Sequence, residues 1–518
     1  MSLLSQRSLG VLVPLFSLRG ERSWGVGEAP DLADFAAVAK AMGASFVMTL
    51  PLLEPSPGLD SPYSAGSFFA LDPLYVSIDA LEDFAALKGR ASLSEEEQSE
   101  LLALTESPQV HHGRVRALKE AVLRRTHAHF LSLDATSARA VDYARFADEH
   151  QSWLPDYALF RALKHKLPQS WRTWPDGVRT RHAPSLEQAR GELRGEISFR
   201  SYLQWVTFRQ VQGARKGARA HGIGLLGDEP FLVADDSSDV WAEQQLYRFD
   251  ATVGAPPDAF SADGQEWGLP PYRWERLAQD GYALFSRRAA HAARIYDAVR
   301  IDHVVGLYRT YHRPIDGSAH YFLPRTEPEQ QAQGEAVLGT WQKQGLELIA
   351  EDLGVIPDFV RRSLTKLEIP GLKVLRWEQE AGRFRDPAGY PEISVATSGS
   401  HDTETSEAWW ESLGEWERRS FAGLGPARGL GEKIHWSEAV WRAVLEVVLF
   451  SKSRTALLPL QDVLSLRARV NTPNTMGPEN WSWRTPHSNA EMLRDPLVRG
   501  RLGAVHELAA ASKRLPSS

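Results

Sequence analysis

Eight short apolar runs constrain what this chain can fold into more than any other feature of the sequence. Polar residues follow each run, and segments with helical spacing separate most of them. The runs cover residues 10–15, 46–50, 222–226, 298–301, 346–350, 372–375, 394–397 and 455–458. Such runs are typical of strands buried on both faces of a parallel sheet. Eight of them predict an α/β fold, a (β/α)8 or TIM barrel.

The second and third runs are about 170 residues apart, which is far too long for a loop. Between them, Ser94 and Glu97 have the spacing of a helix capping box, and Val115, Leu118 and Val122 repeat at helical spacing. The sequence therefore predicts a barrel with large, mainly helical insertions. It predicts no C-terminal β-domain, because the last 34 residues have the pattern of a helix and a tail.

These patterns divide the chain into five expected segments. They are the barrel start with strands 1 and 2 (residues 1–79), a mainly helical insertion (80–200), barrel strand 3 (201–233), a cleft-covering insertion (234–290), and barrel strands 4–8 with C-terminal helices (291–518). In such barrels the active site lies at the ends of the strands, where the following loops begin.

Composition excludes several classes of function. Lys and Arg number 59 against 66 Asp and Glu, so no basic field supports binding to nucleic acid or to an anionic membrane. The absence of cysteine excludes disulfides, thiolate nucleophiles and Cys-ligated metal. The apolar run at residues 9–18 is too short to span a bilayer and lacks a signal-peptide cleavage site, so a cytoplasmic protein is expected.

Two residue types with a potential binding role also have simpler explanations. The 17 tryptophans could cover sugar faces, but they also fill cores, and composition alone favours the core. The pairs His111/His112 and His127/His129 could ligate a metal, yet no carboxylate pattern surrounds them. We expect these histidines to lie on solvated helix faces, and no metal site is predicted.

Four of the predicted strands end in a carboxylate. One such residue could simply cap the next helix, but four on one rim favour an active site. Arg300 and Asp302 are two residues apart and therefore point to the same side of their strand. We expect the guanidinium to lower the pKa of Asp302 and hold it ionised. That arrangement suits a nucleophile, and it equally describes a buried ion pair.

Glu351 and Asp352 end the next strand, and only one of them can face the barrel mouth. Burial and the neighbouring carboxylate should raise the pKa of that group, as a general acid requires. Asp402, after the seventh strand, could bind sugar hydroxyls. Two carboxylates about 5–5.5 Å apart support retaining glycosyl transfer. The sequence contains no such distance, so the residues alone predict a carboxylate-based barrel enzyme.

At these positions the chain resembles the amylomaltase, or 4-α-glucanotransferase, family (glycoside hydrolase family 77) of the α-amylase clan. The resemblance runs from about residue 10 to 510, and the matching blocks occur in the family's order. They are residues 58–64, 72–75, 153–160, 227–231, 256–261, 264–268, 300–303, 350–354, 401–402, 459–464 and 480–484.

The resemblance implies transfer of α-1,4-glucan segments to the 4-hydroxyl of another glucan or of glucose, through a covalent glycosyl-enzyme and without a cofactor. Its partners would be maltooligosaccharides, amylose or starch-like glucans. Asp302 matches the nucleophile, Glu351 the general acid/base and Asp402 the transition-state stabiliser. The positions that match substrate-binding residues are Tyr63, Asp228, Asp258, Trp267, Arg300, His303 and His401.

Several positions depart from the family pattern. They are Glu229, Leu269, the pair Val304 and Val305, and the stretch 314–340. None touches the three carboxylates, so they bear on acceptor preference and product size. An α-1,4-glucan hydrolase with the same carboxylates is the alternative function. A non-catalytic glucan-binding protein would be expected to lack a carboxylate, and a barrel for phosphorylated substrates would need a Gly-rich anion loop.

Overall fold

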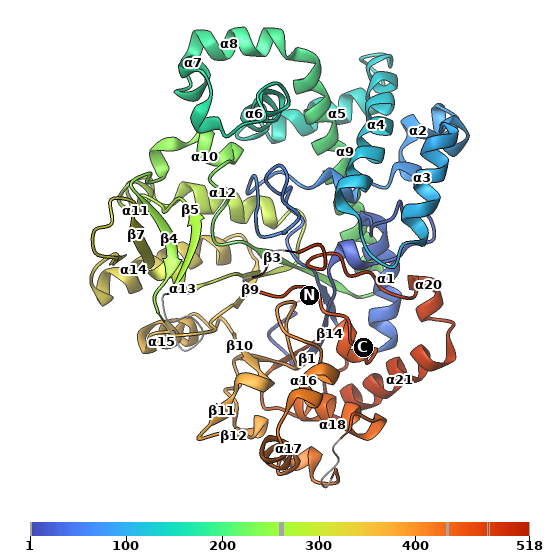
Figure 1. Ribbon diagram of the computed structural model, residues 1–518, viewed down its shortest axis with the longest axis vertical. Coiled ribbons are helices and arrows are strands. Elements are labelled where there is room, and N and C mark those ends of the chain that lie inside the picture. Colours follow the sequence, from blue (N-terminus) through green and yellow to red (C-terminus); the bar gives the residue numbers. More distant parts are fainter. Residues whose placement is uncertain (1–2, 258–263, 431–434, 474, 476, 517–518) are drawn as a thin grey trace.

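The computed structural model describes residues 3–257, 264–430, 435–473, 475 and 477–516 (Figure 1). Eight parallel strands close into a barrel in chain order, which confirms the predicted fold. They are β1 (Ser8–Leu12), β2 (Phe46–Met48), β3 (Gly224–Glu229), β6 (Ala298–Ile301), β9 (Glu347–Ala350), β10 (Gly371–Val374), β13 (Ser394–Thr397) and β14 (Thr455–Pro459). Each overlaps one predicted run, although the ends of several strands differ from the prediction.

The barrel strands are almost entirely buried, as their apolar sequences require. Gly10 in β1 gives room to a bulky neighbour, because a Cβ there would lie 2.2 Å from the ring of Phe46. Strand β3 ends three residues later than the sequence predicted, so Asp228 is part of the strand. The β3–β6 register places it directly opposite Arg300.

Helices lie around the barrel and on its loops (Figure 1). Outside the insertion between β2 and α9, and with α9 included, they are, in chain order, α1 (Ala29–Ala41), α9 (Arg194–Ala220), α10 (Ser238–Ala242), α11 (Trp274–Gln279), α12 (Ala283–Ala292), α13 (Val305–Tyr308), α14 (Glu327–Gln342), α15 (Asp358–Lys366), α16 (Ser406–Ser412), α17 (Glu415–Ala422), α18 (Glu438–Leu449), α19 (Leu460–Val463), α20 (Asn489–Met492) and α21 (Pro496–Ala511). The described residues after β14 form helices and loops, with no further named strand.

Between β2 and α9 lies a group of helices, seen at the top of Figure 1. It contains α2 (Glu82–Ala86), α3 (Glu95–Glu106), α4 (His112–Leu131), α5 (Ala138–Glu149), α6 (Leu154–Lys166), α7 (Asp176–Arg179) and α8 (Ala183–Glu192). The expected capping box of Ser94 and Glu97 begins α3. The expected segment boundary at residue 200 falls inside α9, because the apolar face of this one long helix serves both insertion and barrel.

The expectation that the histidines of this insertion lie on solvated faces was wrong for His112 and His127. Both are buried, since each lies on the face of α4 that packs inward. His112 contacts the carbonyl oxygen of Trp481 at 2.8 Å, and His127 contacts Ser198 at 3.0 Å. His129 pairs with the buried Asp83 at 2.9 Å.

Two smaller β structures extend from the barrel loops. An antiparallel sheet has the order β5-β4-β7-β8. Its strands are β4 (Ala251–Ala255), β5 (Gln265–Leu269), β7 (Thr310–Pro314) and β8 (Tyr321–Leu323). Between β10 and β13, where an alternating barrel would have a helix, residues 375–393 instead form a hairpin of β11 (Gln379–Glu380) and β12 (Arg383–Phe384). No described helix is both long and apolar enough to cross a membrane.

Candidate active site

Arg300 organises the centre of the barrel mouth. Its Nη1 donates to both carboxylate oxygens of Asp228, at 2.7 and 2.6 Å. Its Nη2 lies 3.0 Å from Oδ1 of Asp302, so the two side chains do point to the same side, as predicted. The hydroxyl of Tyr63 donates to Oδ2 of Asp228 at 2.7 Å, so this oxygen accepts from both side chains. One guanidinium thus aligns a fully buried carboxylate and a partly exposed one.

The prediction that Arg300 lowers the pKa of Asp302 was wrong in its net direction. Burial at the bottom of the site raises the pKa of Asp302 to about 7, with Arg300 opposing the rise and Asp228 and Glu351 adding to it. Sequence spacing revealed the guanidinium, but the depth of the site and the other carboxylates depend on tertiary structure. The Asp302 side chain keeps 29% of its surface exposed, so a ligand can reach it.

Glu351 is fixed next to Asp302 through the backbone. The N–H of His303, the residue after Asp302, donates to Oε2 of Glu351 at 2.8 Å, and the N–H of Leu353 donates to Oε1 at 3.1 Å. Asp352 points elsewhere and accepts the N–H of Leu372 at 2.8 Å. Burial raises the pKa of Glu351, opposed by Arg300 and these N–H groups and aided by Asp352. As predicted, the two neighbouring carboxylates point to different places: Glu351 lies next to Asp302, and Asp352 does not.

Asp402 is held in a different electrostatic environment. Its Oδ1 accepts a hydrogen bond from Nδ2 of Asn471 at 2.6 Å, and its Oδ2 lies 3.4 Å from Nε2 of His401. Burial alone would raise the pKa of Asp402, but His401 and Asn471 outweigh it and hold the pKa well below the usual range. Arg469 also donates to the Asp402 carbonyl oxygen. Asp402 therefore stays ionised where its two neighbours gain protons more easily.

Aromatic rings border the carboxylates on two sides. The ring of Tyr63 stacks on His401, with centroids 5.1 Å apart and an interplanar angle of 21°, and Trp481 lies 5.9 Å from Tyr63. On the other side, Trp267 of β5 meets His303 edge to face at 4.7 Å. His303 has a φ of 44°, a left-handed conformation that is unusual for a non-glycine residue. Flat rings beside polar groups are suited to the faces and hydroxyls of a sugar.

The structure brings together every predicted site residue that it describes. Asp258 lies outside the described residues. Three residues at the site were not predicted from the sequence: Asn471 and Arg469, from the loop after α19, and Trp481, which lies in one of the blocks that match the family. Asp462, which also follows β14, caps α16 by accepting the N–H of Ser406 at 2.7 Å. Among the described residues, no group of three or more histidine or acidic side chains could hold a metal ion.

Glu229, one of the departures from the family pattern, is buried behind the site. It pairs with Arg288 at 3.5 Å, and Arg288 also donates to the carbonyl oxygen of Pro230 at 2.7 Å. Burial raises the pKa of Glu229 to about 7 despite this partner. The Glu229 carbonyl oxygen accepts the N–H of Asp302 at 3.0 Å. The departure thus adds a buried polar pair next to Asp302 in the hydrogen-bonded strands and no group in the cleft.

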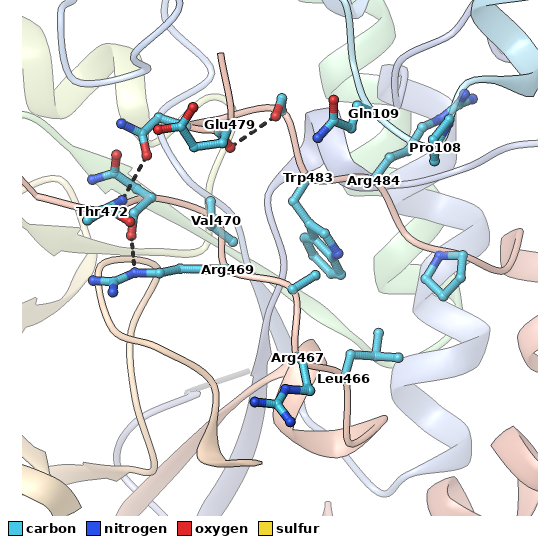
Figure 2. Close-up of a pocket in the computed structure, with 15 residues that line it drawn as sticks. Pro108, Gln109, Leu466, Arg467, Arg469, Val470, Thr472, Glu479, Trp483 and Arg484 are labelled. Carbon is cyan, nitrogen blue, oxygen red and sulfur yellow. Dashed lines mark hydrogen bonds between the residues drawn. The ribbon is translucent and has the colours of Figure 1, made fainter. Parts of the chain in front are cut away.

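A pocket of about 590 Å³ is lined by the loop whose residues Arg469 and Asn471 contact Asp402 (Figure 2). Its walls come mainly from residues 466–472 and 479–486, with Pro108 and Gln109 from the helical insertion. Asn471 and Arg469 line this pocket and also contact Asp402, but none of the three carboxylates lines it. The loop after β14 therefore separates the pocket from the cleft.

Comparison with known proteins agrees with this geometry. A family model described as 4-alpha-glucanotransferase matches residues 13–489. The 4-alpha-glucanotransferase of Thermus thermophilus is 32% identical over 514 residues, covering 92% of this chain and 94% of the relative. That of Chlamydia pneumoniae is 30% identical over 507 residues, covering 93% and 92%. The amylomaltase from Streptococcus agalactiae, solved in complex with acarbose, has a TM-score of 0.84 at 26% identity and covers 99% and 100%.

The barrel and the carboxylates at its mouth define the class as a carboxylate-based TIM-barrel enzyme. Within that class, the chain belongs to the 4-alpha-glucanotransferase family. Its activity is the transfer of α-1,4-glucan segments between chains.

Proposed function

We propose that Asp302 is the nucleophile of this transfer, Glu351 its general acid/base, and Asp402 the group that stabilises the transition state. Asp302 attacks the anomeric carbon of an α-1,4-glucan while Glu351 protonates the departing 4-oxygen. A glycosyl-enzyme ester then links the retained segment to Asp302. Glu351 next removes the proton from the 4-hydroxyl of an acceptor, whose oxygen displaces Asp302. Two inversions leave the new bond in the α configuration.

The proton distribution that this scheme needs has a physical basis in the site. Burial raises the pKa of both Asp302 and Glu351, so at neutral pH a proton is available to the pair. Arg300 contacts Asp302 directly, whereas Glu351 accepts only neutral N–H groups. The guanidinium therefore favours charge on Asp302 and leaves the proton on Glu351, as a nucleophile and a general acid require.

The remaining groups act on the sugar ring. Asp402 is ionised and partly exposed, so it can accept bonds from sugar hydroxyls that tighten as the ring flattens. Arg300, His303 and His401 supply further polar contacts in the same place. Trp267 and Tyr63 flank the site and would limit the access of water to the glycosyl-enzyme. We expect maltooligosaccharides and amylose as donors, and glucose or another glucan as acceptor.

One observation supports these roles more than any other: the bond from the His303 N–H to Glu351. It fixes the general acid against the residue that follows the nucleophile, so both carboxylates serve the same sugar bond. Asp352 provides a matched control, because it is the adjacent carboxylate yet faces β10.

The test is incubation of the purified protein with maltotriose alone, followed by separation of the products by size. Glucose together with a ladder of longer maltooligosaccharides is the expected result. Glu351→Gln should abolish the ladder, whereas Asp352→Asn, which keeps an acceptor for the Leu372 N–H, should retain it. Glucose and maltose with nothing longer would support the hydrolase alternative. Equal loss in both variants would contradict the assignment of Glu351.

A further inference from the structure

Tryptophan exposure singles out one place on the protein surface. Twelve of the 17 tryptophans are buried in the core. Two are exposed: Trp377 with 47% and Trp416 with 57% of its surface accessible. Both adjoin the β11–β12 hairpin, since Trp377 lies two residues before β11 and Trp416 contacts the turn between the strands. Because most tryptophans of this protein are buried, the exposure of these two indole rings needs a physical explanation.

The Trp416 ring is held in place although it is exposed. Its Nε1 donates to the carbonyl oxygen of Gly382 at 3.3 Å, and the guanidinium of Arg383 lies 5.4 Å from the ring centroid. Ala381 and Gly382 form the hairpin turn with φ values of 48° and 72°, as a two-residue turn of this kind requires. The ring is therefore presented to solvent in one orientation.

The hairpin itself is anchored to the protein. The N–H of Phe384 donates to Oγ of Ser420 in α17 at 3.0 Å, and the buried Phe384 ring meets Trp409 and Phe421 edge to face. A binding surface that is rigid before the ligand arrives loses little entropy on binding. The hairpin and the first turn of α17 meet this condition.

The hairpin also begins at the rim of the catalytic cleft. Arg376, next to Trp377, donates to the carbonyl oxygens of Ser398 and Glu404, which flank His401 and Asp402 in sequence. From Trp377 to Gly382 is five residues, so the turn lies at most about 18 Å from Trp377. The segment that leads into the hairpin is therefore bonded to both ends of the segment that carries His401 and Asp402.

We propose that Trp416 and the β11–β12 hairpin form a glucan-binding platform outside the catalytic cleft. The platform stacks the indole on a sugar ring of a long α-1,4-glucan whose other end occupies the carboxylate site. The occupant is a glucan because the fixed indole, with the Arg383 guanidinium over one side of its ring, offers an apolar surface together with N–H groups that donate to sugar hydroxyls. This inference rests on the proposed function and extends it to long substrates. Maltotriose is too short to occupy both places.

The test compares amylose with maltotriose as donors for the full-length protein. Trp416→Ala should raise the KM for amylose roughly 3- to 10-fold, the size of one aromatic stacking contact, and leave the maltotriose rate unchanged. Trp416→Phe, which keeps a ring, should recover most of the loss. Leu497→Ala is the matched control, because Leu497 is 67% exposed but lies on α21. No change with amylose, or an equal change with both donors, would overturn the proposal.

A second measurement separates failure of the platform from failure of the proposed function. Native electrophoresis through a gel that contains amylose reports binding without catalysis. The platform predicts that the wild type is retarded and that Trp416→Ala is retarded less. If the wild type transfers neither donor, the proposed function fails, and this gel still decides the platform. Equal retardation of the two proteins would overturn it.

Discussion

Charged side chains are paired more completely at the seam between the helical insertion and the barrel than in the catalytic cleft. We define the seam by the pairs Lys119–Glu28 and Arg116–Asp72. Lys119 donates its three N–H groups to Glu28 at 2.7 Å and to the Leu74 and Val76 carbonyl oxygens at 2.8 Å. Every donor of that ammonium is used inside the protein. These bonds therefore fix the position of α4, and the Lys119 ammonium has no N–H left to donate to a ligand.

The cleft leaves its charges incompletely satisfied. Asp302 and Asp402 keep 29% and 39% of their side-chain surfaces exposed. Burial and like charges raise the pKa of Asp302 and Glu351, whereas donors around Asp402 hold its pKa low. In the seam, internal bonds occupy the buried charges, although burial still raises the pKa of Glu28. In the cleft, Asp302 and Asp402 keep exposed surface that a substrate can reach.

The largest expected effect comes from breaking the cleft. Asp302→Asn keeps the size of the side chain but removes the proposed nucleophile, so transfer should fall by more than about 10⁴-fold. Because Asp302 is partly exposed, thermal stability should change little. The rate of glucose release from maltotriose and a circular dichroism melt measure the two effects. Transfer within about 10-fold of the wild type would contradict the role of Asp302.

Breaking the seam should give the opposite result. Lys119→Met removes one partner of a fully buried pair and leaves Glu28 uncompensated, so the free energy of unfolding should fall by about 3–5 kcal/mol. Transfer per folded molecule should remain close to that of the wild type. Urea denaturation and activity measured well below the melting temperature test this. A stability loss below about 1 kcal/mol would show that the seam is not rigid.

The next effect concerns pH and the interface between His150, after α5, and His291 of α12. Burial lowers the pKa of His150 to about 4 and that of His291 to about 3. Both values lie below the unfolded value near 6.5, so the unfolded state binds more protons in this window. The stabilisation is present above pH 6.5 and is lost as the pH falls toward 4.

Replacing His291 isolates this contribution. His291→Leu should lose less stability than the wild type between pH 7 and pH 5, because one depressed pKa is gone. Melting temperatures at a series of pH values provide the measurement. Parallel curves for the two proteins would show that acid sensitivity arises elsewhere, for example among the cleft carboxylates.

The smallest effect is expected at the exposed pair Arg114–Glu100, whose side chains are 49% and 35% accessible. Both ions remain hydrated, so Arg114→Ala should leave the free energy of unfolding almost unchanged. Chemical denaturation beside Lys119→Met compares an exposed and a buried pair on the same helix. A loss as large as that of Lys119→Met would contradict the difference between the surface pair and the seam.

Much of the fold was accessible from local pattern. Each of the eight strands is short, apolar and buried, and its apolar sequence can be recognised without reference to the other strands. The capping box of α3 likewise depends only on Ser94 and Glu97. Boundaries were less secure: β3 extends to Glu229, and α9 crosses the expected division at residue 200, because tertiary pairing and packing set where elements end.

For the active site, the sequence by itself determined which residue types are present and which of them share a strand, as with Arg300 and Asp302. These facts depend on chain connectivity and on the two-residue period of a strand. Only the tertiary structure decided that burial outweighs Arg300 at Asp302, that Asn471 bonds Asp402 from 69 residues away, and that His112 and His127 are buried. Desolvation and long-range contacts sum over segments that are distant in sequence, so no local pattern contains them.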